Sequence, residues 1–545
     1  MHDLLIRGAT VYDGLGSSFT GDVAVRDGKI VETRTLNGTS SKSTIDAGGL
    51  ALMPGIVDVH THYDAQVTWD PTLSPSPALG VTTAVMGNCG FGIAPCPAAQ
   101  RDTVLRNLSV VEGMDLGALQ GGVRWEFESF GEYMADLRRI RPLANVAVLA
   151  QHSTIRCAVM GEEASTRPIP SDAELSRMRL LVREALDAGA IGFASSFSPN
   201  HAGWGGKPMP STIASDVELK TLTGELKGKG IFVMATGPRA TPEYMEEIAA
   251  ANGRPAFMVT VLTMYNDAEP KKALEYYERC AAARARGNEV YIHTSCQPLS
   301  FDFTLEEPYL LYSHDAFGRV KAAQPQDRKN IYREKSFRDE FRQNLLHPKQ
   351  GILFYGDWGK IEKEGRSILD LAKEAGKDPV DFFFDLPTDQ QLIGKLFQNN
   401  DAGVAPLLRH AQGVVALSDA GAHLIYFCDA GFGLHFLQHW VRETGTFTLA
   451  EGVRKLTSDP ARKYRIPGRG RIEAGCHADM ILFDPSTVGV SALKKQKDLP
   501  GGGTRMIRDP VGVHGVWVNG VQVHDGKKYL TPAQRPGQVL SEFDA

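Results

Sequence analysis

Short apolar runs alternate with longer amphipathic stretches through most of the chain. Eight runs have the length and composition of buried strands, and stretches such as 172–188 and 271–286 have helical periodicity. The predicted strands span residues 56–59, 81–86, 146–150, 191–194, 231–234, 257–262, 290–292 and 414–417. This alternation predicts an α/β protein with a (β/α)8 TIM-like barrel. A doubly wound open sheet is the alternative, but no glycine-rich phosphate loop follows the first strand.

The two ends of the chain have a different pattern. Residues 1–54 alternate apolar and polar positions, and the dipeptides Asp13-Gly14 and Asp27-Gly28 are typical of hairpin turns. The same pattern returns in residues 468–530. We therefore expect one small β-sandwich domain built from both chain ends, with a barrel of residues 55–467 inserted between them.

Residues 301–399 interrupt the alternation of strands and helices. The segment is rich in Tyr, Phe, Lys and Arg, and it is much longer than the usual connection in an α/β unit. An insertion at this end of a barrel would overhang the active site. We interpret it as an inserted helical lid, with a peripheral helical decoration as the open alternative.

The composition is that of an ordinary globular protein, because 42% of the 545 residues are hydrophobic and 23% are charged. The net charge of -5 comes without a basic stripe, so we expect no nucleic-acid partner. No apolar stretch is long enough to span a bilayer, and the N-terminus lacks a signal-peptide pattern. Seven scattered cysteines favour a reducing compartment. The expectation is a cytoplasmic homo-oligomer with a small-molecule substrate and no membrane partner.

The strongest chemical signal is His60-Thr61-His62, at the end of the first predicted strand. Side chains two residues apart on a strand point to the same side, so the two imidazoles project together. They form a suitable pair of nitrogen ligands for one metal ion. An isolated pair of this kind is more often exposed in a loop, and the other strand ends therefore decide its meaning.

Polar residues also follow other predicted strands, where a barrel builds its active site. They are Cys89 after strand two, His152 after strand three, His201 after strand four, His293 after strand seven and Asp419 after strand eight. Each has an ordinary alternative, because Cys89 could be a buried apolar residue and Asp419 a helix cap. The histidines at 152 and 293 could equally be core residues. Their convergence with the histidine pair makes a metal-assisted hydrolase the leading hypothesis.

Four segments resemble motifs of a known family. The signature of the amidohydrolase superfamily resembles the run Leu52-Met53-Pro54-Gly55-Ile56-Val57-Asp58-Val59-His60-Thr61-His62. Its N-acyl-D-amino-acid deacylase (D-aminoacylase) branch resembles Gly87-Asn88-Cys89-Gly90-Phe91-Gly92 and Ser418-Asp419. Residues 470–479 are similar to the returning strands of the small β-domain in that superfamily.

The resemblance implies a metal-bearing barrel with a β-sandwich that hydrolyses amide or related C–N bonds. It also implies that His60 and His62 bind the buried metal. Cys89 would contribute a thiolate, and Asp419 would both bind the metal and shuttle the proton.

One departure from the branch concerns the ends of strands five and six. D-aminoacylases have a histidine after each of these strands, where they hold a tightly bound zinc. Here no histidine occurs between His201 and His293. We therefore expect one divalent ion, with zinc as the expected metal, bound by three ligands: His60, His62 and Asp419. Cys89 is the candidate fourth ligand.

The expected reaction attacks an amide with metal-activated water, and Asp419 takes the proton of that water and returns it to the departing nitrogen. His152 and His293 are further candidate catalytic residues, which would stabilise the oxyanion. Arg239 and Tyr265 stand where the branch has its other ligands. With His201, they are the candidate substrate-binding residues. A surface salt bridge is the alternative for Arg239.

Three functions stay open at this point. The first is hydrolysis of an amide bond in a small molecule similar to an N-acyl amino acid. The second keeps the fold and one metal but deaminates, opens a lactam or cleaves a C–C bond. The third is a non-catalytic binding protein on the same fold. Retention of His60, His62 and Asp419 argues against the third, whereas the fold alone does not separate the first two.

Overall fold

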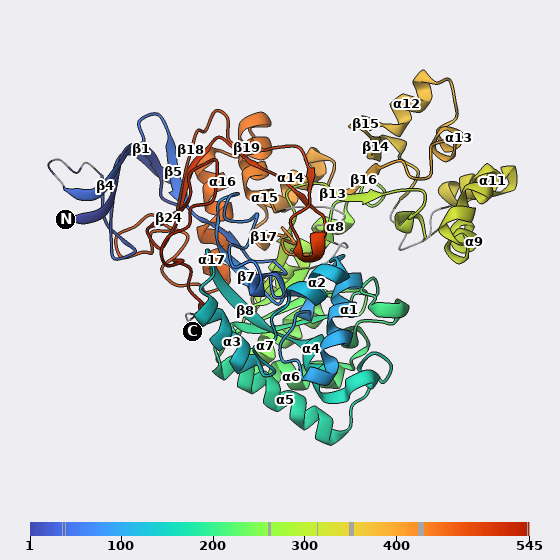
Figure 1. The fold of residues 1–545 in the computed structure, drawn as a ribbon, viewed down its shortest axis with the longest axis horizontal. Coiled ribbons are helices and arrows are strands. Elements are labelled where there is room, and N and C mark those ends of the chain that lie inside the picture. Colours follow the sequence, from blue (N-terminus) through green and yellow to red (C-terminus); the bar gives the residue numbers. More distant parts are fainter. Residues whose placement is uncertain are drawn as a thin grey trace. The chain divides into compact units, whose positions relative to one another are not determined.

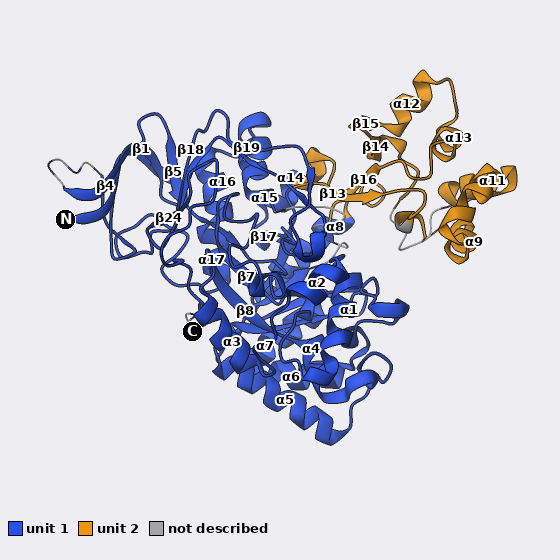
Figure 2. Ribbon diagram, in the orientation of Figure 1, with its two compact units in different colours: residues 1–263, 272–296, 405–545 blue, residues 264–271, 297–404 orange. Residues whose placement is uncertain are grey.

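The computed structural model describes residues 1–545 except 35, 37, 39, 260–262, 313, 348–353, 423–429, 542, 544 and 545. The chain forms two compact units, coloured separately in Figure 2. The first contains residues 1–263, 272–296 and 405–545, and the second contains residues 264–271 and 297–404.

The first unit contains an eight-stranded parallel sheet, of which β7, β8 and β17 are labelled in Figure 1. The order of its strands is β17-β12-β11-β10-β9-β8-β7-β6. Its strands are β6 (Ile56–Asp58), β7 (Val81–Met86), β8 (Asn145–Gln151), β9 (Gly192–Ser196), β10 (Ile231–Ala235), β11 (Ala256–Val259), β12 (Val290–Thr294) and β17 (Gly413–Val415). Every residue in these strands is buried, as expected for a parallel sheet covered on both faces. All eight predicted strands are present, and the end of the predicted strand 257–262 lies outside the described residues.

The first and last strands are joined beyond their carboxyl ends. Thr61 and Ala420 form a parallel bridge, and the Ser418 hydroxyl donates to the carbonyl of His60 at 3.1 Å. These contacts curl the sheet on itself, and the predicted TIM-like barrel is confirmed.

Helices alternate with the barrel strands. They include α1 (Arg101–Val111), α2 (Leu116–Gly122), α3 (Phe130–Ile140), α4 (His152–Met160), α5 (Asp172–Asp187), α6 (Asp216–Thr223), α7 (Pro242–Asn252), α8 (Lys272–Ala285), α15 (Phe432–His435), α16 (Leu449–Leu456) and α17 (Ser458–Lys463). In α5, the Ser171 hydroxyl accepts from the backbone N–H of Glu174, whose carboxylate accepts from the Ser171 N–H. This capping box fixes the start of the helix, while Met178 and Val182 on one face are buried. Helices α5 and α8 match the predicted stretches 172–188 and 271–286.

A second, mixed sheet combines both ends of the chain. Its N-terminal strands are β1 (His2–Tyr12), β2 (Ser18–Arg26), β3 (Lys29–Arg34), β4 (Ser41–Asp46) and β5 (Ala51–Pro54), and its C-terminal strands are β18 (Met480–Phe483), β23 (Val513–Val518) and β24 (Val521–His524). The central pair is β5 and β18, which run antiparallel with Leu52 opposite Leu482. Both leucines belong to one buried core with Trp517. The expected β-domain from both chain ends is confirmed, while its boundaries at residues 54 and 468 stay predictions.

The second unit contains both strands and helices. A four-stranded sheet has the order β13-β16-β14-β15, with strands Leu299–Phe303, Leu392–Phe397, Ile361–Lys363 and Arg366–Ser367 in that order. The helices are α9 (Gly318–Ala322), α10 (Arg328–Arg333), α11 (Lys335–Leu346), α12 (Ile368–Glu374) and α13 (Pro379–Phe384), and α14 (Asp401–Arg409) follows at the boundary with the first unit. Aromatic rings fill its core, with Phe317, Phe337 and Phe384 in mutual contact. The expected lid function of residues 301–399 stays a prediction. None of the helices described in the whole chain has the length and hydropathy needed to cross a membrane.

Candidate metal centre

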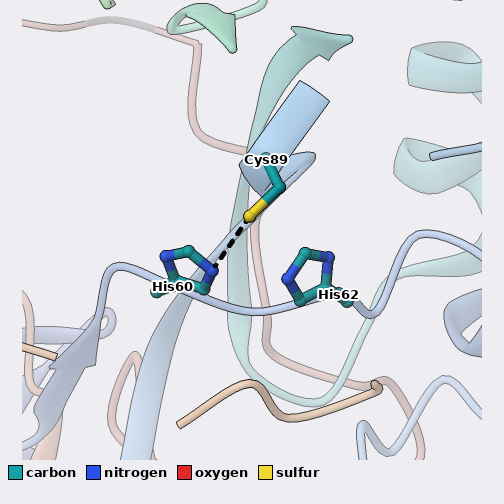
Figure 3. Close-up of side chains that lie close together, drawn as sticks. All are labelled: His60, His62 and Cys89. Carbon is teal, nitrogen blue, oxygen red and sulfur yellow. Dashed lines mark hydrogen bonds between the residues drawn. The ribbon is translucent and has the colours of Figure 1, made fainter. Parts of the chain in front are cut away.

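Two histidines and a cysteine converge at the carboxyl ends of the first two barrel strands. His60 and His62 follow β6, and both are buried, with 1% and 3% of their surfaces exposed. Cys89 lies in the turn after β7, and its sulfur is 3.7 Å from Nε2 of His60 (Figure 3). One donor atom from each of the three residues lies within 4.8 Å of the other two. Within the described residues, this is the one group of three such side chains close enough to hold a metal ion.

The carboxylate of Asp419 joins this group from the end of the last strand. Its Oδ1 is 3.1 Å from Nε2 of His60 and 3.7 Å from Nε2 of His62. Burial opposes the negative charge of Asp419, but the two adjacent histidines hold the pKa of its carboxyl well below the usual value. The carboxylate is therefore stabilised in its ionised form beside the two histidines.

Two distances from Nε2 of His60 suit neighbouring ligands of one divalent metal ion. Tetrahedral ligands at zinc distances of about 2.0–2.3 Å lie about 3.3–3.8 Å from one another. The distances from Nε2 of His60 to Cys89 and to Asp419 are 3.7 and 3.1 Å. Imidazole nitrogen, thiolate sulfur and carboxylate oxygen are also the donors that zinc prefers.

The backbone is unusual at the residues that deliver these donors. Cys89, Leu417 and Asp419 have φ angles of 56°, 74° and 46°, which non-glycine residues seldom adopt. Such conformations cost about 1–3 kcal/mol each and cluster at functional sites. Gly421 has a φ of +92° and lies so close to His62 that a Cβ atom would be 2.6 Å from its carbonyl group. Strain and close approach are thus concentrated around the donor group.

The second ring nitrogen of each histidine, Nδ1, also lies near a polar partner. Nδ1 of His60 lies 3.0 Å from Nδ1 of His293, and Nδ1 of His62 lies 3.4 Å from a carboxylate oxygen of Glu112. Such partners fix the orientation of metal-binding imidazoles. Sequence reasoning missed Glu112, because it follows helix α1 rather than a strand and no local pattern distinguishes it.

Two buried aspartates hold the loops that carry the donors. Asp58 accepts from the backbone N–H of His60 at 3.2 Å. Asp64 accepts from the N–H of Gly87 at 3.0 Å and from the side-chain amide of Gln151 at 2.9 Å. Burial raises the pKa of each aspartate to about 7. Asp64 therefore links the first-strand loop to the turn before Cys89.

Comparison with known proteins identifies the family to which this site belongs. A family model described as "Amidohydrolase family" matches residues 43–329 and 400–524. The chain belongs to the amidohydrolase family. This assignment confirms the metal-dependent amidohydrolase expected from residues 52–62.

Relatives extend over the whole length of this amidohydrolase. The N-acyl-D-aspartate deacylase of Alcaligenes xylosoxydans xylosoxydans is 29% identical over 568 residues, covering 100% of this chain and 96% of the relative. The D-aminoacylase of the same organism is 28% identical over 560 residues, covering 100% and 98%. Among solved structures, the N-acyl-D-glutamate deacylase from Bordetella bronchiseptica, complexed with zinc and a phosphonate inhibitor, has a TM-score of 0.67 at 24% identity. That alignment covers 99% of this chain and 100% of the other, and it shows that the fold is shared.

The amidohydrolase holds His152 in a separate buried network. Nδ1 of His152 lies 2.8 Å from the hydroxyl of Ser195, and Nε2 lies 2.8 Å from the carboxylate of Glu218. Arg156 forms an ion pair with the other oxygen of Glu218. Burial lowers the pKa of His152 despite its carboxylate partner. This is the arrangement of a core histidine with both ring nitrogens engaged, and the expected catalytic role stays a prediction.

Each candidate substrate-binding residue has polar or ring contacts of its own. Nδ1 of His201 is 2.8 Å from the hydroxyl of Ser196. Arg239 pairs with Asp216 at 2.9 Å and stacks over the ring of Phe197, as in the salt-bridge alternative.

Tyr265 belongs to the second unit, where its backbone N–H donates to the side chain of Gln398 at 2.7 Å. None of these contacts tests substrate binding by the three residues, so that role stays a prediction.

The ends of β10 and β11 carry hydroxyl groups where the deacylase branch has histidines. Thr236 follows β10 and is 2% exposed, and Thr263 lies beyond β11 and is 1% exposed. The hydroxyl of Thr236 is buried without a hydrogen-bond partner among the described residues. Neutral hydroxyls are poor zinc ligands, so the donor atoms of this amidohydrolase gather on the side of β6, β7 and β17.

Proposed function

We propose that this protein is a mononuclear metal-dependent hydrolase that cleaves the amide bond of N-acyl amino acids. The observation that carries the proposal is the convergence of His60, His62, Cys89 and Asp419, with Thr236 and Thr263 in place of further nitrogen ligands. We infer one zinc ion, bound by His60, His62 and Asp419, with Cys89 as the fourth ligand.

The relatives support the substrate class. Three full-length relatives from Alcaligenes xylosoxydans xylosoxydans, which are 26–29% identical to this chain, are deacylases of N-acyl-D-amino acids. A D-aminoacylase with a TM-score of 0.68 to this chain is described as having a binuclear metal centre with one-metal activation and second-metal attenuation. Activation by a single ion in that protein is consistent with a mononuclear site here.

Asp419 has the central role among the protein groups. When bound, the metal polarises the amide carbonyl and increases the acidity of the attacking water. The ionised carboxylate of Asp419 takes the proton of that water and returns it to the departing nitrogen, which would otherwise be a poor leaving group. Burial of the surrounding groups excludes bulk water and strengthens these interactions.

The remaining expectations form part of the same proposal. We infer that residues 301–399 act as a lid, that the enzyme is cytoplasmic and that it assembles as a homo-oligomer. Deletion of residues 301–399 should abolish turnover while the barrel stays folded, as judged by circular dichroism and metal content. Unchanged kinetics after the deletion would contradict the lid.

The substrate class is tested with the full-length protein after loading with zinc. The substrates are matched series of N-acetyl-D- and N-acetyl-L-amino acids with acidic and neutral side chains, and chromatography measures the free amino acid. We expect release from the D series and loss of activity after chelation. Release from neither series by protein that holds zinc would contradict the proposed substrate class.

A further inference from the structure

Two buried side chains outside the ligand set extend the hydrogen-bonded structure behind His60. Nδ1 of His60 lies 3.0 Å from Nδ1 of His293, and Nε2 of His293 lies 2.6 Å from the hydroxyl oxygen of Tyr464. His60 and His293 are 1% exposed and Tyr464 is fully buried. His60 follows β6, His293 lies in β12 and Tyr464 follows α17, so the contacts join three segments that are distant in sequence.

Packing holds the hydrogen-bonded row of His60, His293 and Tyr464 in place. The ring of Phe257, on β11, lies 4.2 Å from the ring of Tyr464 and 6.0 Å from the ring of His293. Burial, together with the nearby Asp58, raises the pKa of Tyr464 well above its usual value, so the phenol keeps its proton. No water is needed to connect the three polar groups, because each distance is that of a direct hydrogen bond.

The two ring nitrogens of His60 have different partners. Nε2 faces the sulfur of Cys89 and the carboxylate of Asp419, whereas the other nitrogen lies on the side away from Cys89 (Figure 3). A nitrogen that binds a metal cannot carry a proton, so a neutral His60 with a free Nε2 carries its proton on Nδ1. Nδ1 then donates to His293.

This assignment determines the next hydrogen bond. Nδ1 of His293 must be free of a proton in order to accept from His60, because two N–H groups cannot face each other at 3.0 Å. The single proton of His293 therefore lies on Nε2, which donates to Tyr464. A tyrosine hydroxyl accepts as well as donates, so its oxygen completes the chain.

We propose that His293 and Tyr464 are positioning residues, which keep His60 in the tautomer that binds the metal through Nε2. The inference rests on the proposed function, because it requires the ion to lie at His60. His293 then acts on the metal-binding residue His60, whereas a direct contact with the oxyanion was expected from the sequence. The acceptor oxygen of Tyr464 is what keeps the proton of His293 on Nε2.

The test measures zinc affinity rather than turnover. Full-length Tyr464→Phe removes the acceptor and leaves the N–H of His293 buried and unpaired. Loss of such an outer partner typically weakens metal binding about tenfold to a hundredfold. Competition with a chromophoric chelator gives the zinc dissociation constant, and thermal unfolding of the metal-free protein gives the stability.

Tyr277→Phe is the matched control. Tyr277 is also fully buried on the first unit, and its hydroxyl lies 2.8 Å from that of Thr294, beside His293 in the same strand. We expect both variants to lose stability and only Tyr464→Phe to lose zinc affinity. Equal zinc affinities in the two variants would overturn the inference.

His293 provides a second comparison, which holds if Tyr464→Phe fails to fold. The side-chain oxygen of His293→Asn can accept from Nδ1 of His60, whereas His293→Leu offers no acceptor. We expect the asparagine variant to retain the tighter zinc binding, and equal affinities would again overturn the inference. The proposed function fails differently, if the wild-type protein binds no zinc or if His60→Ala binds it as tightly as the wild type.

Discussion

The carbonyl oxygen of Ala420 accepts a hydrogen bond from the backbone N–H of His62 at 2.8 Å. This bond joins the loop after the last barrel strand to the loop after the first. Asp419 and His62 are thereby set on neighbouring backbone segments, with 3.7 Å between Oδ1 and Nε2. Closure of the barrel and assembly of the donor group are the same structural event.

Gly421→Ala should disrupt this junction. A Cβ at residue 421 would lie 2.6 Å from the carbonyl of His62, in a backbone conformation with φ +92°. Gly287→Ala is the control, because Gly287 has φ +93° and nothing within 4 Å of the added Cβ. Both variants bear the cost of about 1–2 kcal/mol for a left-handed alanine. Metal analysis by mass spectrometry should find bound zinc lost only from Gly421→Ala, and equal zinc content would contradict the role of the close approach.

Asp419→Asn should separate metal binding from catalysis. Asparagine tolerates the φ of 46° at this position and keeps the size of the side chain. His60, His62 and Cys89 should retain much of the metal, while loss of the proton acceptor lowers kcat about 10²–10⁴-fold.

His60→Ala should lose both metal and activity. Steady-state kinetics and metal content measured on the same preparations check the two expectations. Full activity in Asp419→Asn, or two tightly held metal equivalents per wild-type chain, would refute the mononuclear mechanism.

Glu112→Gln should weaken the metal site from behind His62. The carboxylate lies 3.4 Å from Nδ1 of His62, and both side chains are almost fully buried. Replacing the anion by a neutral amide reduces the basicity of the imidazole, so the zinc dissociation constant should increase about tenfold to a hundredfold. Glu443→Gln is the control, because Glu443 pairs with His439 at 3.3 Å on the surface. If both variants bind zinc like the wild type, Glu112 has no part in positioning the ligand.

His314 should make the second unit sensitive to acid. It is 2% exposed among the rings of Phe341 and Phe354, and burial lowers its pKa from 6.5 to about 4. Between these values the unfolded chain binds the proton and the folded chain does not, so stability falls as the pH decreases from about 6.5 to 4.

The expected contribution to this loss is about 2 kcal/mol between pH 7 and pH 5. Urea unfolding of the wild type and of His314→Leu at both pH values measures it. The variant should show a correspondingly smaller change with pH, and identical changes in the two proteins would exclude His314 as the cause.

Local patterns in the sequence were sufficient to predict the barrel and the main donors. The period of two in His60-Thr61-His62 follows from the geometry of a strand, and Asp419 was predicted from its position after the eighth strand. Glu112 and Tyr464 were missed because they follow helices, and their contacts join segments distant in sequence. The sequence left both a catalytic and a core role open for His152. Its contact with Glu218 on helix α6 depends on packing that no local pattern encodes.

Pairing of β5 with β18 affects the order in which the protein can mature. Strand β5 ends at Pro54, two residues before β6 begins, and the N–H of Gly55 between them donates to the carbonyl of Asp479 at 2.8 Å. During synthesis, His60 and His62 are therefore made long before β18, the strand that pairs with β5. Incomplete chains lack β18, so we expect the donor group to assemble only in the completed polypeptide.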